Sequence, residues 1–219
     1  MRVFLALCLA AGLGGCNMVL SDKPLFTAAD ATGPALREGL WLTVEDDCPV
    51  DTRKPTRDWP FCADWGVLRN GVVQRRNEFP SEAYPDQYET WSRAVVLLAA
   101  GEPMILQAGT AQEEPFFDER PEPELSSFEL FSFHALEPTE RDDQGRIVAV
   151  RAWTVQCGPR ARKANGRLEN ETREPLPGLT KRRPNCSADT REAVINAAKA
   201  SRDWTPKPAV FRWIRDGDR

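Results

Sequence analysis

The residues of this chain best suited to chemistry are its six cysteines, because it has only one histidine, His134. A thiol can be acylated, be oxidised to a disulfide or bind a metal ion. Cys8 and Cys16 lie in the apolar N-terminal segment, and the other cysteines are scattered over the remaining chain: Cys48, Cys62, Cys157 and Cys186. A zinc site of thiolates needs close pairs such as C-x₂-C. The spacing offers no such pair, so we predict no metal site.

The N-terminal segment MRVFLALCLAAGLGGC has the parts of an export signal in the right order. Arg2 supplies a positive charge, residues 3–13 form an apolar run, and Leu13-Gly14-Gly15-Cys16 is a small-residue site that ends in a cysteine. The run of about a dozen residues is too short for a membrane-spanning helix, which needs roughly 20. The quartet resembles the lipobox of bacterial lipoprotein precursors. An ordinary secretory signal with a cysteine at its end is the alternative.

The lipobox resemblance implies an anchor and a location. Residues 1–15 would be removed as a signal peptide, and Cys16 would become the first residue, its thiol carrying a diacylglycerol with palmitate-like chains. More than one buried acyl chain holds a protein stably at a membrane. In enterobacterial lipoproteins an aspartate after the cysteine retains the protein at the inner membrane, whereas this chain has Asn17. The expected location is therefore the cell envelope, at the outer membrane facing the periplasm, with the inner membrane as the alternative.

The other four cysteines are expected to form disulfides, because their number is even and the chain carries an export signal. Four cysteines allow three pairings. Local closure is the simplest of them, with Cys48–Cys62 spanning a proline-rich loop and Cys157–Cys186 spanning a longer polar one.

The sequence indicates no catalytic set. His134 shares a predicted strand face with apolar residues, which is typical of a packed histidine, and no serine lies in a G-x-S-x-G elbow. Neighbouring carboxylates lie in proline-rich or turn segments, where they are expected to be solvated: Glu113-Glu114, Asp118-Glu119 and Asp142-Asp143. The chain also lacks a Walker A loop and a dinucleotide-binding glycine motif. We therefore expect no cofactor and no catalytic residue.

Three tryptophans are candidate ligand contacts. Trp59, Trp65 and Trp91 lie in or near proline-rich connections, where an aromatic ring can contact a sugar or an acyl chain. Trp41, Trp153 and Trp213 lie in predicted strands and are expected to pack in the core.

Strand-like alternation dominates the rest of the chain. Leu40, Leu42 and Val44 alternate with polar or aromatic residues, and Asn70-Gly71 between apolar runs predicts a hairpin. The strands expected after the first are 65–68, 72–74, 93–99, 104–108, 127–136, 146–156 and 210–214. In the strand at 127–136 the apolar residues switch faces at Leu130, which indicates a bulge or burial of both faces.

The remaining segments define the domain boundaries. Residues 16–38 lack periodicity and are predicted to be the lipidated N-terminus and tether, with one periplasmic domain at 39–219. Residues 109–125 and 158–185 are predicted loops. An apolar stripe predicts one late helix, capped by Ser187 or Asp189. These elements predict a mainly β fold with an α+β tendency, either an antiparallel β-sandwich or a partly open barrel of about seven or eight strands with one late helix.

Charge and location together favour a non-enzymatic role. The chain has 29 basic and 33 acidic residues, interleaved and without a basic stripe, so nucleic acid is not an expected partner. The favoured function is that of a lipid-anchored envelope lipoprotein that binds another envelope component. The alternative is a small β-barrel that binds an apolar ligand or lipid, and an envelope hydrolase is a third reading.

Overall fold

The computed structural model describes residues 17–60, 62–77, 90–109, 114–115, 130–160, 172, 174–205 and 207–217. The lipobox and Cys16 lie outside these residues, as do 116–129 and 161–171, which include parts of the two predicted loops and the first residues of the strand predicted at 127–136.

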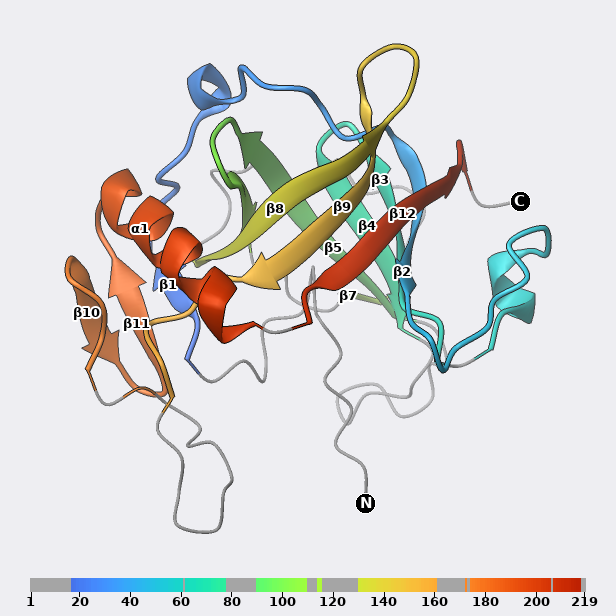
Figure 1. Cartoon of the computed structure of the whole chain (residues 1–219). Helices are drawn as coiled ribbons and strands as arrows, with labels where there is room; N and C mark the ends of the chain where they lie inside the picture. The colour runs from blue at the N-terminus through green and yellow to red at the C-terminus, as the bar shows by residue number, and fades with distance from the viewer. Residues whose placement is uncertain are drawn as a thin grey trace, which may run out of the picture.

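Eight antiparallel strands form a closed barrel (Figure 1). In barrel order they are β2 (Gly39–Val44), β3 (Trp65–Arg69), β4 (Val72–Asn77), β5 (Thr90–Ala99), β6 (Met104–Gly109), β8 (Phe131–Arg141), β9 (Ile147–Thr154) and β12 (Ala209–Arg215). The C-terminal β12 lies between β9 and β2, and the pairing of β8 with β9 closes the ring. The mainly β fold with one late helix is thus confirmed, and of the two predicted architectures the barrel is observed, although it is closed and not partly open.

Two of the predicted turns form as their sequences indicate. Asn70 and Gly71 have φ values of 48° and 74°, which suit the two-residue hairpin between β3 and β4. Gly145, with φ of 76°, ends the turn between β8 and β9, where its N–H donates to the Asp142 carbonyl at 2.9 Å. Each turn joins two strands that pair with each other in the barrel, so the conformation that the turn residues favour is the one that the barrel requires.

Both faces of β8 are covered, which explains the switch of apolar residues at its start. Phe131, Phe133 and Ala135 point outward into a core that lies outside the barrel, beneath helix α1 (Arg191–Ser201). Their alternate neighbours Leu136 and His134 point into the barrel, opposite Met104 and Leu106 of β6. The register with β6 is continuous from Phe131 to Leu136, so this part of β8 contains no bulge.

Helix α1 packs on the outer wall through one stripe: Ala193, Val194, Ala197 and Ala198, all buried. It begins later than predicted. Thr190 is its N-cap, accepting a hydrogen bond from the Ala193 N–H at 3.2 Å, whereas Ser187 lies in a strand. The apolar stripe could be predicted because its spacing is a property of the helix sequence alone. The position of the N-cap could not be predicted, because residues 185–188 pair with distant strands, and this pairing outweighs their local tendency to start a helix.

Three short strands extend the sheet outside the barrel. They are β1 (Val19–Ser21), β10 (Leu179–Arg182) and β11 (Asn185–Ala188), joined in the order β10-β11-β1-β8. A further two-residue strand, β7 (Glu114–Pro115), pairs with β5. The last part of the predicted loop at 158–185 is therefore a hairpin. The prediction missed it because its two strands are only four residues long and one of them, β11, also pairs with β1, which is distant in the chain.

The prediction of a tether at 16–38 is corrected for its described part. Val19 and Phe26 are buried in the outer core, and Asn17 is 1% exposed. Gln107 of β6 holds Leu25 and Phe26 against the barrel wall through hydrogen bonds of 2.7–3.0 Å. This segment lacks periodicity because it follows the outside of the barrel as irregular chain, with side-chain partners in place of a strand ladder.

Both predicted disulfides are present with local pairing. The S–S distances are 2.13 Å for Cys48–Cys62 and 2.08 Å for Cys157–Cys186. The loop closed by the first covers the outer face of β2 and β3, where Trp59 packs with Leu40, Leu42 and Val67. The second joins the chain after β9 to β11, in the outer core near α1.

Candidate functional site

One end of the barrel is covered by the chain that precedes β2. Residues 31–38 run across this end, at the top of Figure 1. The segment is held by backbone hydrogen bonds of 2.9 Å from the Arg37 N–H to the Ile147 carbonyl and from the Ile147 N–H to the Ala35 carbonyl. Leu36, between these two bonds, is therefore fixed at the mouth of the barrel. We call this the Leu36 end.

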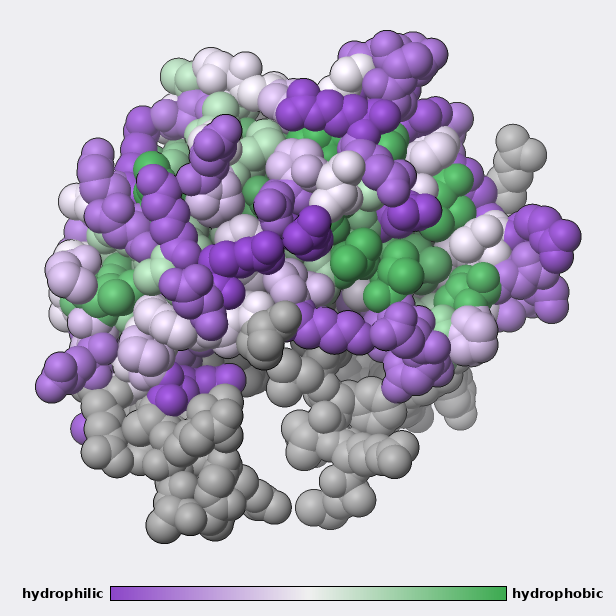
Figure 2. All heavy atoms as spheres, in the orientation of Figure 1, coloured by the Kyte–Doolittle hydropathy of each residue, from purple (hydrophilic) through white to green (hydrophobic). Residues whose placement is uncertain are grey.

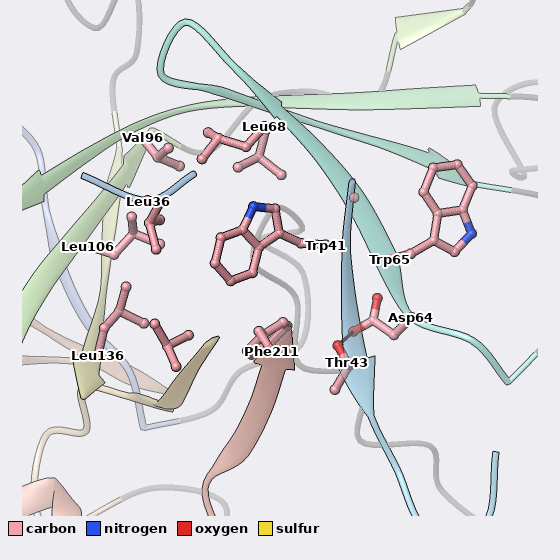
Figure 3. Close-up of a pocket in the computed structure, with 13 residues that line it drawn as sticks. Leu36, Trp41, Thr43, Asp64, Trp65, Leu68, Val96, Leu106, Leu136 and Phe211 are labelled. Carbon is pink, nitrogen blue, oxygen red and sulfur yellow. Dashed lines mark hydrogen bonds between the residues drawn. The ribbon is translucent and has the colours of Figure 1, made fainter. Parts of the chain in front are cut away.

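An apolar pocket lies inside the barrel beneath Leu36, with a volume of about 70 Å³. Figure 3 shows side chains from different strands converging on it. The principal apolar members are Trp41, Leu68, Val96, Leu106, Leu136 and Phe211. They meet because side chains alternate between the two faces of each strand, so every second residue points inward. Trp41 and Phe211 come from the neighbouring strands β2 and β12, which close the barrel.

The indole of Trp41 presents an apolar surface to this pocket. Its ring N–H donates to the Arg37 carbonyl at 2.8 Å, so its polar atom is satisfied by the chain at the Leu36 end. Beside it, the Arg37 guanidinium carbon lies 3.5 Å from the centre of the Trp213 ring, a cation–π contact. These contacts hold Trp41 in place at the closed end of the pocket.

Two polar residues border the pocket away from the Leu36 end. The Thr43 hydroxyl donates to the Asp64 carboxylate at 3.2 Å, and the Thr43 N–H donates to the Asp64 carbonyl at 2.8 Å. Thr43 is the last inward-facing residue of β2, and Asp64 directly precedes β3. The pocket is therefore apolar at its covered end and has polar groups toward the other.

His134 is a further polar residue of the barrel interior. Its side chain is buried, with 2% of its surface exposed, and neither ring nitrogen has a hydrogen-bond partner among the residues that the structure describes. Burial lowers the pKa of the imidazole to about 4, so the ring is neutral at physiological pH. The prediction of a packed histidine on an apolar face is correct in its burial. The sequence could not show that the ring lacks a partner.

The three tryptophans proposed as ligand contacts have different surroundings. Trp59 is 8% exposed and packs edge-to-face on Trp65, with ring centres 6.3 Å apart, outside the barrel. Trp65 borders the pocket but its ring points away from Trp41 (Figure 3). The side chain of Trp91 is outside the described residues. The tryptophan whose ring faces into the pocket is Trp41, which the sequence predicted to be a core residue of a strand and not a ligand contact.

The carboxylate pairs bring no acid–base site together in the described part of the chain. Glu114 belongs to β7, while Glu113, Asp118 and Glu119 are outside the described residues. Asp142 binds Arg146 at 2.7 Å and Arg37 at 3.6 Å. Desolvation acts to raise the pKa of Asp142, but hydrogen bonds from Arg146 outweigh it and the pKa is lowered. This carboxylate stabilises the turn between β8 and β9.

A larger groove of about 450 Å³ lies on the outer surface, between the β5–β6 turn and the end of α1. Within this groove Arg202 contacts Glu137 at 3.3 Å and lies 5.0 Å from the centre of the Trp153 ring. Figure 2 shows a mostly hydrophilic surface in this view, with apolar residues over β12 and β2. Compared with this groove, the interior pocket is more enclosed and its lining is more uniformly apolar.

The chain matches no protein-family model, no curated protein and no solved structure. Within the described ranges, no group of three His, Cys, Asp or Glu side chains is placed to hold a metal ion. No helix among those residues is both long and apolar enough to cross a bilayer.

Proposed function

We propose that this protein is a lipid-anchored barrel of the bacterial envelope that binds the apolar part of a small ligand. The observation that carries the proposal is the apolar pocket inside the closed barrel. An eight-stranded barrel is just wide enough either to be filled by side chains or to hold one small ligand. Here the side chains beneath Leu36 leave space, and that space is lined by Trp41 and Phe211.

The size of the pocket limits what it accepts. At about 70 Å³ it is smaller than the cavity of roughly 150 Å³ that binds benzene in another protein. An aromatic ring would require the lining side chains to move. The narrow end of an alkyl chain fits better, and each methylene buried would contribute about 0.8 kcal/mol. The proposed ligand is therefore aliphatic in the part that enters the pocket.

The anchor is proposed from the lipobox resemblance, and the fold adds a consequence. Asn17 is buried and its N–H donates to the Pro184 carbonyl at 3.1 Å. Cys16 is one peptide bond away, so a lipid on its thiol would hold the barrel without a spacer. A barrel fixed beside a membrane would meet aliphatic ligands that leave or enter the bilayer. Binding of another envelope component stays a prediction.

Hexane is a suitable probe for the pocket, because it is aliphatic and has no polar group. We expect a saturable change in tryptophan emission on titration of the wild-type protein. Trp41→Phe should lose most of this change, because Trp41 is the tryptophan whose ring points into the pocket. Absence of any saturable change in the folded wild-type protein would overturn the pocket as a binding site.

A matched pair of valine substitutions separates filling of the pocket from a general effect of added bulk. Val96→Phe should fill the pocket and weaken hexane binding at least tenfold, whereas Val44→Phe should not, because Val44 is 48% exposed. Circular dichroism would check that both variants fold. Equal affinity of folded Val96→Phe and wild type would contradict the assignment of the pocket.

The anchor has its own experiment. Cells expressing the full chain are grown with labelled palmitate, and the purified protein is analysed by mass spectrometry. The expected product begins at Cys16 and carries label, and Cys16→Ser carries none. An unlabelled product, or one that begins at another residue, would remove the anchor from the proposal while leaving the pocket untouched.

A further inference from the structure

His134 adjoins the pocket. It lies on the inner face of β8, opposite Leu106 of β6 and Thr154 of β9. Leu106 lines the pocket, and so does Leu136, two residues along the same face of β8. Side chains at directly opposite positions have Cβ atoms about 5 Å apart, so the imidazole is the next interior group beyond these two leucines.

The imidazole is unusual because it is buried without a partner. A neutral imidazole has one N–H donor and one acceptor nitrogen, and neither nitrogen of His134 is hydrogen-bonded to any described residue. Most buried polar side-chain atoms are paired, and an unpaired one is unfavourable by about 1–3 kcal/mol. Position 134 could hold leucine or phenylalanine at lower free energy. A histidine there indicates that something else pairs with it.

The other polar groups of the interior lie toward the same end of the barrel as His134. Neighbouring strands are antiparallel, so β8 begins where β2 and β9 end. Ser132 is near the start of β8, Thr154 is the last residue of β9, and Thr43 is near the end of β2. The opposite end is covered by Leu36. Among the described residues, these polar side chains therefore lie toward the end of the barrel opposite Leu36, whereas the pocket beneath Leu36 is lined mainly by apolar side chains.

We propose that the ligand is an aliphatic carboxylic acid whose chain end lies beneath Leu36 and whose carboxyl group hydrogen-bonds to His134. This inference rests on the proposed function, because the chain must enter the same pocket. A carboxyl group can share or transfer its proton to the imidazole, giving a charge-assisted hydrogen bond between imidazolium and carboxylate. The hydroxyls of Ser132 and Thr154, at neighbouring interior positions, are of the type that can accept from the second ring nitrogen.

The single histidine makes a direct test feasible. The full-length protein, with ¹⁵N in its imidazole, is titrated with hexanoic acid at pH 6 and, separately, with hexane. We expect hexanoic acid to shift both imidazole nitrogen signals toward imidazolium values, and hexane to leave them near their starting positions. The affinity for hexanoic acid should exceed that for hexane at least tenfold.

His134→Phe should lose this preference while still binding hexane, since phenylalanine keeps the ring shape without the polar atoms. His134→Gln provides a second variant that keeps a donor and an acceptor, and it should retain part of the preference. If wild type binds both probes equally and the imidazole signals do not move, the carboxylic acid is excluded and the apolar pocket stands. If neither probe binds the folded protein, the proposed function fails as well.

Discussion

The side-chain amide of Gln107 and the backbone of Phe26 exchange two hydrogen bonds, each 3.0 Å long. The same amide oxygen also accepts from the Leu25 N–H at 2.7 Å. Gln107 has no exposed surface. One side chain thus supplies the backbone hydrogen bonds that a neighbouring strand would otherwise supply to the N-terminal segment. It joins that segment to the outer wall of the barrel.

Substitution Gln107→Leu should therefore destabilise the protein. It would leave two N–H groups and one carbonyl buried without partners, and we expect the free energy of unfolding in urea to fall by about 2–4 kcal/mol. Gln144→Leu is the control, because Gln144 is exposed in the turn after β8. A loss no larger in Gln107→Leu than in the control would mean that these bonds contribute little.

The stability of the ligand-free protein should depend on pH through His134. Burial lowers the pKa of His134 from 6.5 to about 4, so between these values the unfolded chain binds a proton that the folded chain does not. The free energy of unfolding should be highest above pH 6.5 and fall by about 3 kcal/mol as the pH falls to about 4. The described residues at the neighbouring interior positions are uncharged and do not offset this change: Leu106 and Thr154 opposite His134, and Ser132 and Leu136 on the same face of β8.

His134→Phe isolates this contribution from that of the carboxylates. The difference in unfolding free energy between the variant and the wild type should grow in favour of the variant as the pH is lowered from 7 to 4. Two curves that stay parallel over this range would show that the imidazole is not buried in its neutral form.

Removal of either disulfide should destabilise the domain. In the chain-entropy model, loops closed at separations of 14 and 29 residues stabilise by about 3 kcal/mol and slightly more, respectively. We expect Cys157→Ser with Cys186→Ser to be the more harmful pair, because both cysteines are buried in the outer core, whereas Cys62 is exposed. Thermal unfolding measures the loss. In the wild type, alkylation without reductant should label none of these four thiols.

Asn17 should contribute to stability independently of any lipid on the preceding cysteine. Its side-chain amide donates to the Gly158 carbonyl at 2.9 Å, and its side-chain oxygen accepts from the Thr172 N–H at 3.2 Å. Its φ of 78° lies in the left-handed region, which asparagine tolerates better than most residues. Asn17→Ala should lower the unfolding free energy by about 2–3 kcal/mol in a soluble form that lacks residues 1–16.

The control for this change is Asn196→Ala, on the exposed side of α1. Alanine is the better helix former, so this variant should be neutral or slightly stabilising. Equal changes in unfolding free energy for the two substitutions would mean that residue 17 lies outside the folded domain, as the predicted tether at 16–38 requires.

Several elements could be predicted because their causes are local. The Asn70-Gly71 turn needs positive φ at two adjacent residues, and the stripe on α1 is a repeat of small apolar residues within one helix. The alternation around Trp41 predicted a strand, and it correctly put Leu40 and Leu42 on one face of that strand and Trp41 on the other. The pairing of the cysteines followed from the shortest loops. In each case the information lies within about thirty residues of chain.

Other features depend on partners far away in the chain. The strand at Val19–Ser21 exists because β8 and β11 lie on either side of it, and its own three residues carry no period. Likewise, alternation shows that Trp41 and Leu40 face opposite ways but not which way is inside. Closure of β12 onto β2 decides that, and it puts Trp41 in the pocket while Trp59 packs on the outside.

By itself, the sequence determined the class of the fold, its hairpin turns and its late helix, since these follow from short-range periodicity and turn chemistry, and it favoured the local cysteine pairs through their short loops. Only the tertiary structure decided that these pairs form, that the barrel closes, that the N-terminal segment packs on it, and that His134 has no hydrogen-bond partner among the described residues beside an apolar pocket. The physical reason is that burial and hydrogen-bond satisfaction are properties of surroundings, which are assembled from residues more than a hundred positions apart, as Leu36 and Ile147 are.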